Sequence, residues 1–160
     1  MRFLRTIRFD ASDERVFERA AEPEEWAVSG AFAFADIDPD TLRGKQRQAF
    51  RSGFLGTQSF GWSTFVAVAE IPPDQLDAVV LRLARHFVEH YGAPSPEAAL
   101  PAARAEAEFT AGICEHPINT LIAVERRAGP DGIVERFRTV QRTGEASHAK
   151  IWTIVDDQEA

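Results

Sequence analysis

Stretches in which hydrophobic and polar residues alternate predict β-strands at both ends and in the middle of the chain. In residues 26–36 both faces of the alternation are apolar, which is typical of a central strand. Residues 128–132 read Ala-Gly-Pro-Asp-Gly and predict a hairpin turn between the two strands that flank them. The predicted strands are 2–9, 26–36, 62–70, 119–126, 132–142 and 150–155.

Apolar residues at helical spacing predict three main helices, over 39–52, 73–91 and 96–115, and a short one over 12–19. Asp38 and Pro39 form a good helix start, and Gly92 can end the second main helix in a left-handed conformation. Ser95 can cap the third, but Pro101 lies too deep for the first turn, so we expect a kink or restart there.

These elements cluster rather than alternate strictly, which favours an α+β fold. We expect a mainly antiparallel sheet of about five to six strands packed against two to three helices. A length of 160 residues predicts a single globular domain over 1–160, with a frayed tail over about 156–160. The chain is 44% hydrophobic and 27% charged, which excludes a disordered chain.

The charge and the single cysteine narrow the classes of partner and the compartment. A net charge of −7 argues against general nucleic-acid binding, which needs a basic surface. Cys114 cannot form an intrachain disulfide, which fits a reducing compartment. Arg5 and Arg8 interrupt the apolar start, so no secretory signal is expected, and the long uncharged run 52–69 is too polar for a membrane helix. We therefore predict a cytoplasmic protein without a membrane partner.

A His-x-x-Glu-His string over 86–90 is the first candidate site, because it matches the inverted zincin pattern. His86 and His90 could share a zinc ion, with Glu89 as the base for a bound water. In a closed structural variant, Cys114 and His116 complete the ligand set. The other interpretation needs no metal. A helical wheel places His90 inside the apolar stripe, His86 on its shoulder and Glu89 away from it. The pair would then cap the core, with Cys114 buried as a small hydrophobe and His116 in a loop. We favour this interpretation and expect no cofactor, with zinc as the alternative.

A row of arginines is the second candidate site. Arg43, Arg47 and Arg51 recur every four residues, where like charges oppose helix formation by a few tenths of a kcal/mol each. An anionic ligand or acidic partner would offset this repulsion. The following segment 52–62, here called the glycine loop, could add backbone N–H donors and aromatic surface through Gly53, Gly56 and Trp62. It matches no phosphate-binding motif. The alternative is a solvated face paired with carboxylates from elsewhere.

Four stretches of the chain carry a resemblance to a known family. They are Val-Phe-Glu-Arg-Ala-Ala-Glu-Pro at 16–23, Glu-Trp-Ala-Val at 25–28, Phe-Gly-Trp-Ser-Thr-Phe-Val-Ala-Val-Ala-Glu at 60–70 and His-Pro-Ile-Asn-Thr-Leu-Ile-Ala-Val at 116–124. Over nearly its full length the chain resembles short proteobacterial proteins of the domain-of-unknown-function family 6505. The resemblance transfers no catalytic residues. It implies an accessory role linked to molybdenum-dependent or formate dehydrogenase systems.

Together these features predict a non-catalytic cytosolic accessory or interaction protein that presents the arginine row and the glycine loop to another protein. A homodimer that pairs through an exposed sheet edge is a further hypothesis for the assembly. The alternative function is a small zinc-dependent hydrolase that uses His86, Glu89 and His90.

Overall fold

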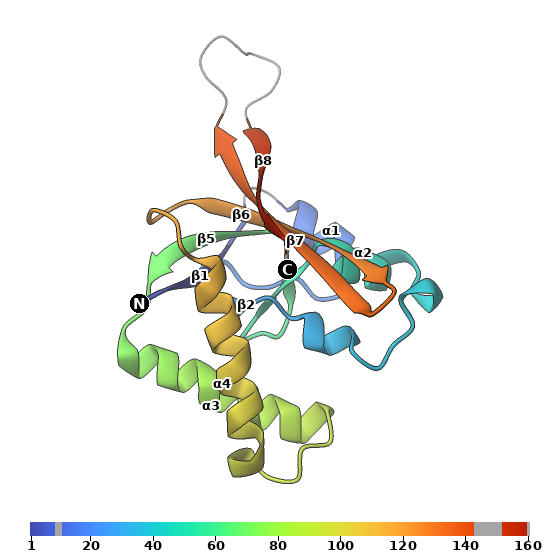
Figure 1. Ribbon diagram of the computed structural model, residues 1–160, viewed down its shortest axis with the longest axis vertical. Helices are drawn as coiled ribbons and strands as arrows, with labels where there is room; N and C mark the ends of the chain where they lie inside the picture. The colour runs from blue at the N-terminus through green and yellow to red at the C-terminus, as the bar shows by residue number, and fades with distance from the viewer. Residues whose placement is uncertain (9–10, 143–151, 160) are drawn as a thin grey trace.

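The computed structural model describes residues 1–8, 11–142 and 152–159, with side chains up to residue 140. Its framework is an eight-stranded sheet in the order β4-β3-β2-β1-β5-β6-β7-β8, in which every pair of neighbouring strands is antiparallel (Figure 1). The strands are β1 (Arg2–Ile7), β2 (Trp26–Val28), β3 (Phe54–Gly56), β4 (Trp62–Ser63), β5 (Phe65–Glu70), β6 (Leu121–Gly129), β7 (Gly132–Arg142) and β8 (Trp152–Glu159).

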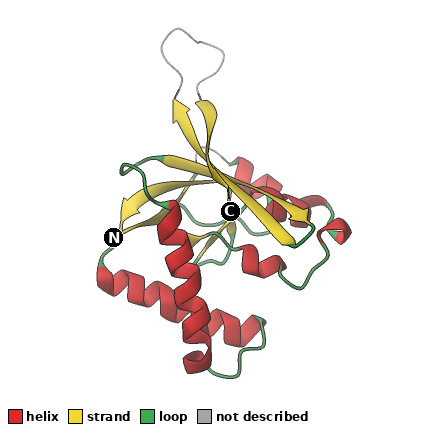
Figure 2. Cartoon of the chain, in the orientation of Figure 1, coloured by secondary structure: helices red, strands yellow, loops and turns green. Residues whose placement is uncertain are grey.

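Four α-helices and two short 3-10 helices, η1 and η2, accompany the sheet (Figure 2). They are α1 (Ser12–Val16), η1 (Ala31–Phe34), η2 (Pro39–Thr41), α2 (Gly44–Ser52), α3 (Pro73–His90) and α4 (Pro96–Ile113). The mixed α/β class and the antiparallel sheet agree with the prediction. The strand and helix numbers were underestimated.

The main core lies between α3, α4 and one face of the central strands. Strand residues such as Phe3 and Val28 meet Val79 and Leu83 of α3 and Ala103 of α4. All five are essentially inaccessible to solvent. Burying side chains of this size stabilises the fold by roughly 1.5–3 kcal/mol each. The hydrophobic spacing of α3 predicted this packing from sequence alone.

The sheet curls, so that strands far apart in its order meet. Four strands separate β3 from β7, yet the rings of Phe54 and Phe137 lie 6.2 Å apart between their centroids. The other face of the central strands thereby encloses a second buried cluster, which includes Leu4, Val66 and Cys114. A third, smaller cluster joins Phe34 of η1 and Phe50 of α2 to Phe17 and Leu42.

Several predicted strand boundaries were wrong for local reasons. The strand expected over 26–36 ends at Val28, because Gly30 takes a left-handed conformation with φ +87° and the chain continues as η1. β3 lies inside the segment predicted as a loop, and 62–70 divides into β4 and β5. The tail predicted over 156–160 is not frayed as far as Glu159, because β8 pairs with β7 there.

Two predicted helices also differ from the structure. The helix expected over 39–52 begins as η2, passes through extended residues at Leu42 and Arg43, and only then forms α2. The expected break at Pro101 does not occur, since α4 continues through it. Ser95 caps α4 as predicted, its side chain accepting a hydrogen bond from the Ala98 N–H. Within the described part of the chain, no helix has the length and apolarity needed to cross a membrane.

Candidate functional site

A surface cavity of about 410 Å³ lies between η2, α2 and the outer half of β6. Arg43, Arg47 and Arg51 line it from the side of α2, and Arg127 lines it from β6. All four side chains belong to exposed residues. We call this cavity the basic pocket. It joins the predicted arginine row to an arginine that lies far away in the sequence.

Few groups among the described residues neutralise the charge of the basic pocket. The Arg43 Nη1 donates to the backbone oxygens of Asp40 and Leu42 at 2.7 and 2.8 Å, which fixes this side chain locally. Among the residues that the structure describes, none forms an ion pair or a side-chain hydrogen bond with Arg47, Arg51 or Arg127. Two acidic residues also line the pocket, Asp40 and Glu125.

Glu125 is already paired with Arg138, at 3.1 Å between the carboxylate and the guanidinium. Asp40 is therefore the remaining carboxylate of the lining, against the four exposed arginines, because the fifth lining arginine, Arg126, is paired with Glu135. The pocket thus carries an excess of positive charge in a chain whose net charge is −7. The alternative interpretation, in which carboxylates from elsewhere pair with the row, finds no support among the described residues.

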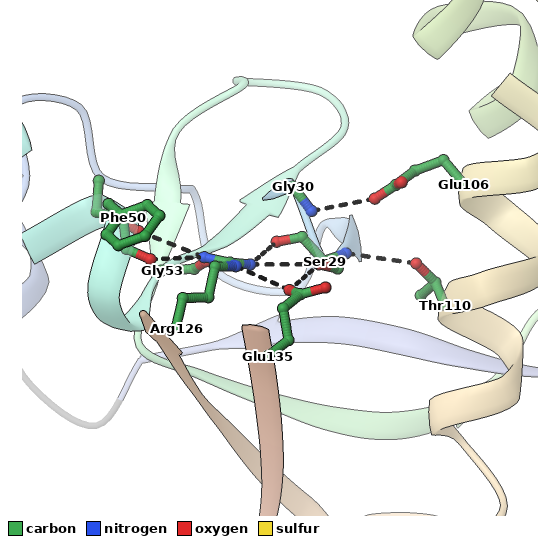
Figure 3. Close-up of polar contacts among 9 residues, drawn as sticks. Ser29, Gly30, Phe50, Gly53, Glu106, Thr110, Arg126 and Glu135 are labelled. Atoms are coloured by element: carbon green, nitrogen blue, oxygen red, sulfur yellow. Dashed lines mark hydrogen bonds and ion pairs between the residues drawn. The ribbon is translucent and has the colours of Figure 1, made fainter. Parts of the chain in front are cut away.

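A fully buried arginine holds the wall of the basic pocket in place. Arg126 Nε donates to the Glu135 carboxylate at 2.8 Å (Figure 3). Its Nη1 donates to the backbone oxygens of Phe50 and Gly53 at 3.2 and 2.6 Å, and its Nη2 donates to the backbone oxygen of Ser29. The carbonyls of Phe50 and Gly53 end α2, so Arg126 caps that helix from a neighbouring strand. It thereby fixes α2 against β6.

Two buried carboxylates complete this polar cluster. Ser29 Oγ donates to Glu135 at 2.5 Å, and the Gly30 N–H donates to Glu106 of α4 at 3.1 Å (Figure 3). Burial lowers the pKa of Arg126, and the nearby carboxylates oppose this shift. Burial likewise raises the pKa of Glu106. Because Arg126, Ser29 and both carboxylates each bond to other groups of the protein, the cluster is a structural support rather than an open site.

The backbone donors of the glycine loop are already occupied by a carboxylate of the protein itself. The N–H groups of Gln58 and Ser59 donate to Glu25 Oε1 at 2.9 and 3.0 Å. Ser59 Oγ and the Glu22 N–H donate to Glu25 Oε2 at 2.7 Å each. Glu25 itself is 2% exposed. The loop does have the anion-cradling geometry that its sequence suggested, but in this structure the anion it holds is internal.

Gly53, Gly56 and Trp62 serve close packing and lie outside the lining of the basic pocket. A Cβ on Gly56 would fall 2.2 Å from Glu25 Oε1, so only glycine leaves room for that carboxylate. A Cβ on Gly53 would fall 2.8 Å from the Trp62 ring. The sequence grouped these three residues with the arginine row, and the structure separates them from it.

The structure does not bring the four predicted zinc ligands together. The rings of His86 and His90 lie 4.8 Å apart at the end of α3, where His86 stacks flat on Phe60 at 3.8 Å. Cys114 lies in the second core cluster, and its thiol donates to the Thr110 backbone oxygen. Burial raises its pKa to about 12, so the thiol is not activated. The described residues contain no group of three or more His, Cys, Asp or Glu placed to hold a metal ion.

The helical wheel placed His86 correctly on the shoulder of the apolar stripe but assigned His90 to the wrong environment. His90 was expected inside the apolar stripe, yet its side chain is 60% exposed because α3 ends there. His86 is the more buried of the two, and burial, with a contribution from His90, lowers its pKa to about 4. Glu89 is exposed, as the wheel predicted. His116 is half-buried in the turn after α4, and its backbone N–H donates to the Cys114 oxygen at 2.8 Å.

Sequence reasoning missed Arg126, Arg127 and Glu135. A signal for the buried pair was present. Arg126 lies in phase with the inward-facing Ile122 and Val124, and the register of the β6–β7 hairpin places Glu135 directly opposite it. Arg127 has no comparable signal, since only the docking of the hairpin against α2 brings it to the pocket.

Comparison with known proteins gives one family. The sequence profile of the family of unknown function DUF6505 matches residues 1–156. The chain belongs to this family. For this DUF6505 protein, no curated protein and no solved structure gives a significant match. The family assignment agrees with the resemblance seen in the sequence. The family has no known function, so the basic pocket is the feature of the structure that points to one.

Proposed function

We propose that this DUF6505 protein is a non-catalytic binding protein that docks an acidic segment of a partner protein in the basic pocket. One observation carries the proposal: Arg47, Arg51 and Arg127 converge on one cavity and have no acidic partner among the described residues. Crowding like charges is unfavourable unless a ligand neutralises them. Arginine is also suited to this role, because its planar fork matches a carboxylate in two hydrogen bonds.

The direct test uses a fluorescein-labelled polyglutamate peptide and fluorescence anisotropy. Arg47→Glu should weaken binding by about tenfold or more at low salt, because it reverses a charge within the cavity. Arg82→Glu on α3 is the matched control, since it changes the net charge equally outside the pocket. Raising the salt should weaken binding of the parent protein, as expected for exposed charges. Equal losses in both variants would mean that only the net charge matters, which would refute a specific pocket.

Affinity capture from the native source tests the same site with its natural partner. The full-length protein and Arg82→Glu should retain a partner that Arg47→Glu loses, while the melting temperatures of all three stay nearly equal. A partner that survives the Arg47 reversal would show that docking occurs elsewhere.

From the family resemblance alone, we further propose that the partner belongs to the assembly of a molybdenum-dependent or formate dehydrogenase system. The Arg47-dependent partner should then be a subunit or maturation factor of such an enzyme. A partner of any other kind would refute this assignment and leave the docking site intact.

A further inference from the structure

A second cavity, of about 560 Å³, adjoins the basic pocket. It lies between the segment 31–39, which includes η1, and the turn of the β6–β7 hairpin. Pro39 and Ala128 line both cavities, so the two meet at these residues. In Figure 1, the β6–β7 turn and α2 lie on the same side of the molecule, in line with this arrangement. We call the second cavity the apolar cleft.

The chemistry of the apolar cleft differs from that of the basic pocket. The cleft is lined by the large apolar residues Phe32, Phe34, Ile37 and Ile133, together with Pro39 and small residues, and Asp38 is the charged residue of the lining. The Asp38 carboxylate already accepts a hydrogen bond from the Asp40 N–H at 3.0 Å. Ile37 is 43% exposed, so a bound segment can cover this side chain.

We infer that the two cavities form one groove for an extended peptide segment of the partner, in which acidic residues are followed directly by apolar residues. The carboxylates lie against Arg47, Arg51 and Arg127, and the apolar side chains cover Ile37 and Ile133. This inference rests on the proposed function and adds the sequence type that the groove selects. Because the two cavities meet at Pro39 and Ala128, the acidic and apolar parts of the bound segment must be contiguous.

A peptide suits this groove better than an anionic lipid or fatty acid. Pockets for small apolar ligands enclose most of the ligand surface, whereas Ile37 and the turn glycines Gly129 and Gly132 lie at or near the surface. An extended peptide can lie in such an open groove without being enclosed.

The test compares labelled peptides of about ten residues by anisotropy. One has a run of Glu followed by Val and Thr in alternation, the second is polyglutamate of equal length, and the third is a scramble of the first. The first should bind about tenfold tighter than the other two, as expected from burying one or two more apolar side chains. Ile37→Asp should reduce the affinity for the first peptide by a larger factor than the affinity for polyglutamate, because the added negative charge weakens both peptides but the lost apolar contact affects only the first. Ile118→Asp, at an equally exposed isoleucine outside both cavities, is the matched control.

The outcomes separate the two proposals. Equal binding of all three peptides, weakened by Arg47→Glu and affected to the same extent by Ile37→Asp, would refute the groove and leave the acidic docking site intact. Absence of arginine-dependent binding of every peptide would refute both. Submicellar sodium oleate is tested as a competitor of the first peptide. If oleate displaces this peptide more strongly than unlabelled peptide does, and if Ile37→Asp abolishes the effect of oleate, the groove binds an amphiphile and the peptide proposal is overturned.

Discussion

Removing the Arg126 guanidinium while keeping Glu135 should destabilise the fold severely. Arg126→Met preserves most of the side-chain volume, so the loss reflects charge and hydrogen bonds rather than a cavity. It leaves the Glu135 carboxylate, which is 7% exposed, as an uncompensated buried charge. It also leaves the carbonyls of Phe50, Gly53 and Ser29 without this donor. Breaking a buried ion pair from one side costs about 3–5 kcal/mol, a large share of the roughly 5–15 kcal/mol that holds a typical domain together.

A second substitution separates the cost of the charge from the cost of the carbonyls. Arg126→Met with Glu135→Gln removes the unpaired charge and keeps an acceptor for Ser29 Oγ. The double variant should therefore be more stable than Arg126→Met alone by about 1–2 kcal/mol. The neighbouring Arg127→Met is the control, because that side chain is exposed and has no described partner. It should change stability by less than about 0.5 kcal/mol.

Urea unfolding followed by tryptophan fluorescence measures these differences, provided that the dependence on denaturant is the same in all variants. A loss below about 1 kcal/mol in Arg126→Met would refute the assignment of Arg126 as the support of α2. So would equal stability of the single and double variants, since the buried charge would then contribute nothing.

Four further substitutions test other parts of the structure by the same unfolding assay. Gly56→Ala should destabilise the fold by on the order of 2 kcal/mol, because the new Cβ collides with Glu25. Gly112→Ala in α4 should stabilise the fold by roughly 0.5–1 kcal/mol, because a Cβ there meets nothing within 4 Å. Similar effects of the two substitutions would contradict the collision at Gly56. The pKa of His86 is about 4 in the folded protein, below the 6.5 that is usual for histidine. As the pH falls, this histidine is therefore protonated in the unfolded chain before it is protonated in the folded protein. Stability from this group is present above about pH 6.5 and is lost as the pH falls toward about 4, and His86→Phe should remove that loss. Burial raises the folded pKa of Glu106, so its contribution is present at low pH and is lost as the pH rises. Glu106→Gln should therefore gain stability relative to the parent as the pH rises above the ordinary pKa of a glutamate, and a constant difference would refute the shift.

The parts of the fold that depend on local signals could be predicted from the sequence. The apolar spacing of α3, the Ser95 cap of α4 and the Gly-Pro-Asp-Gly turn of the β6–β7 hairpin each involve residues close together in the chain. β3 could not be predicted, because its three residues are too few to show a period. The end of β2 depends on the conformation of Gly30, which a run of alternating apolar residues does not reveal.

The sequence predicted one side of the candidate site, the arginine row, but not the other side. The arginine row lies within one segment, so its spacing could be read directly, although Arg43 precedes α2 rather than belonging to it. Its partner Arg127 and the adjoining apolar cleft are products of the curl of the sheet, which no local pattern encodes. The zinc string shows the opposite error: a short motif matched, but Cys114 and His116 lie at the end of a different helix from the two histidines.

The Arg126 side chain bonds to residues that are distant in the sequence, and this has a consequence for how the protein folds. Its acceptors Gly53, Phe50 and Ser29 lie 73, 76 and 97 residues earlier in the chain. Closing such long loops is entropically slow, and a guanidinium leaves water favourably only when all its acceptors are in position. The β6–β7 hairpin should therefore dock in a late, all-or-none step. In the finished protein its amides at Arg126 and Glu135 should exchange with solvent only when the whole domain opens, and not through separate fraying of the hairpin tip.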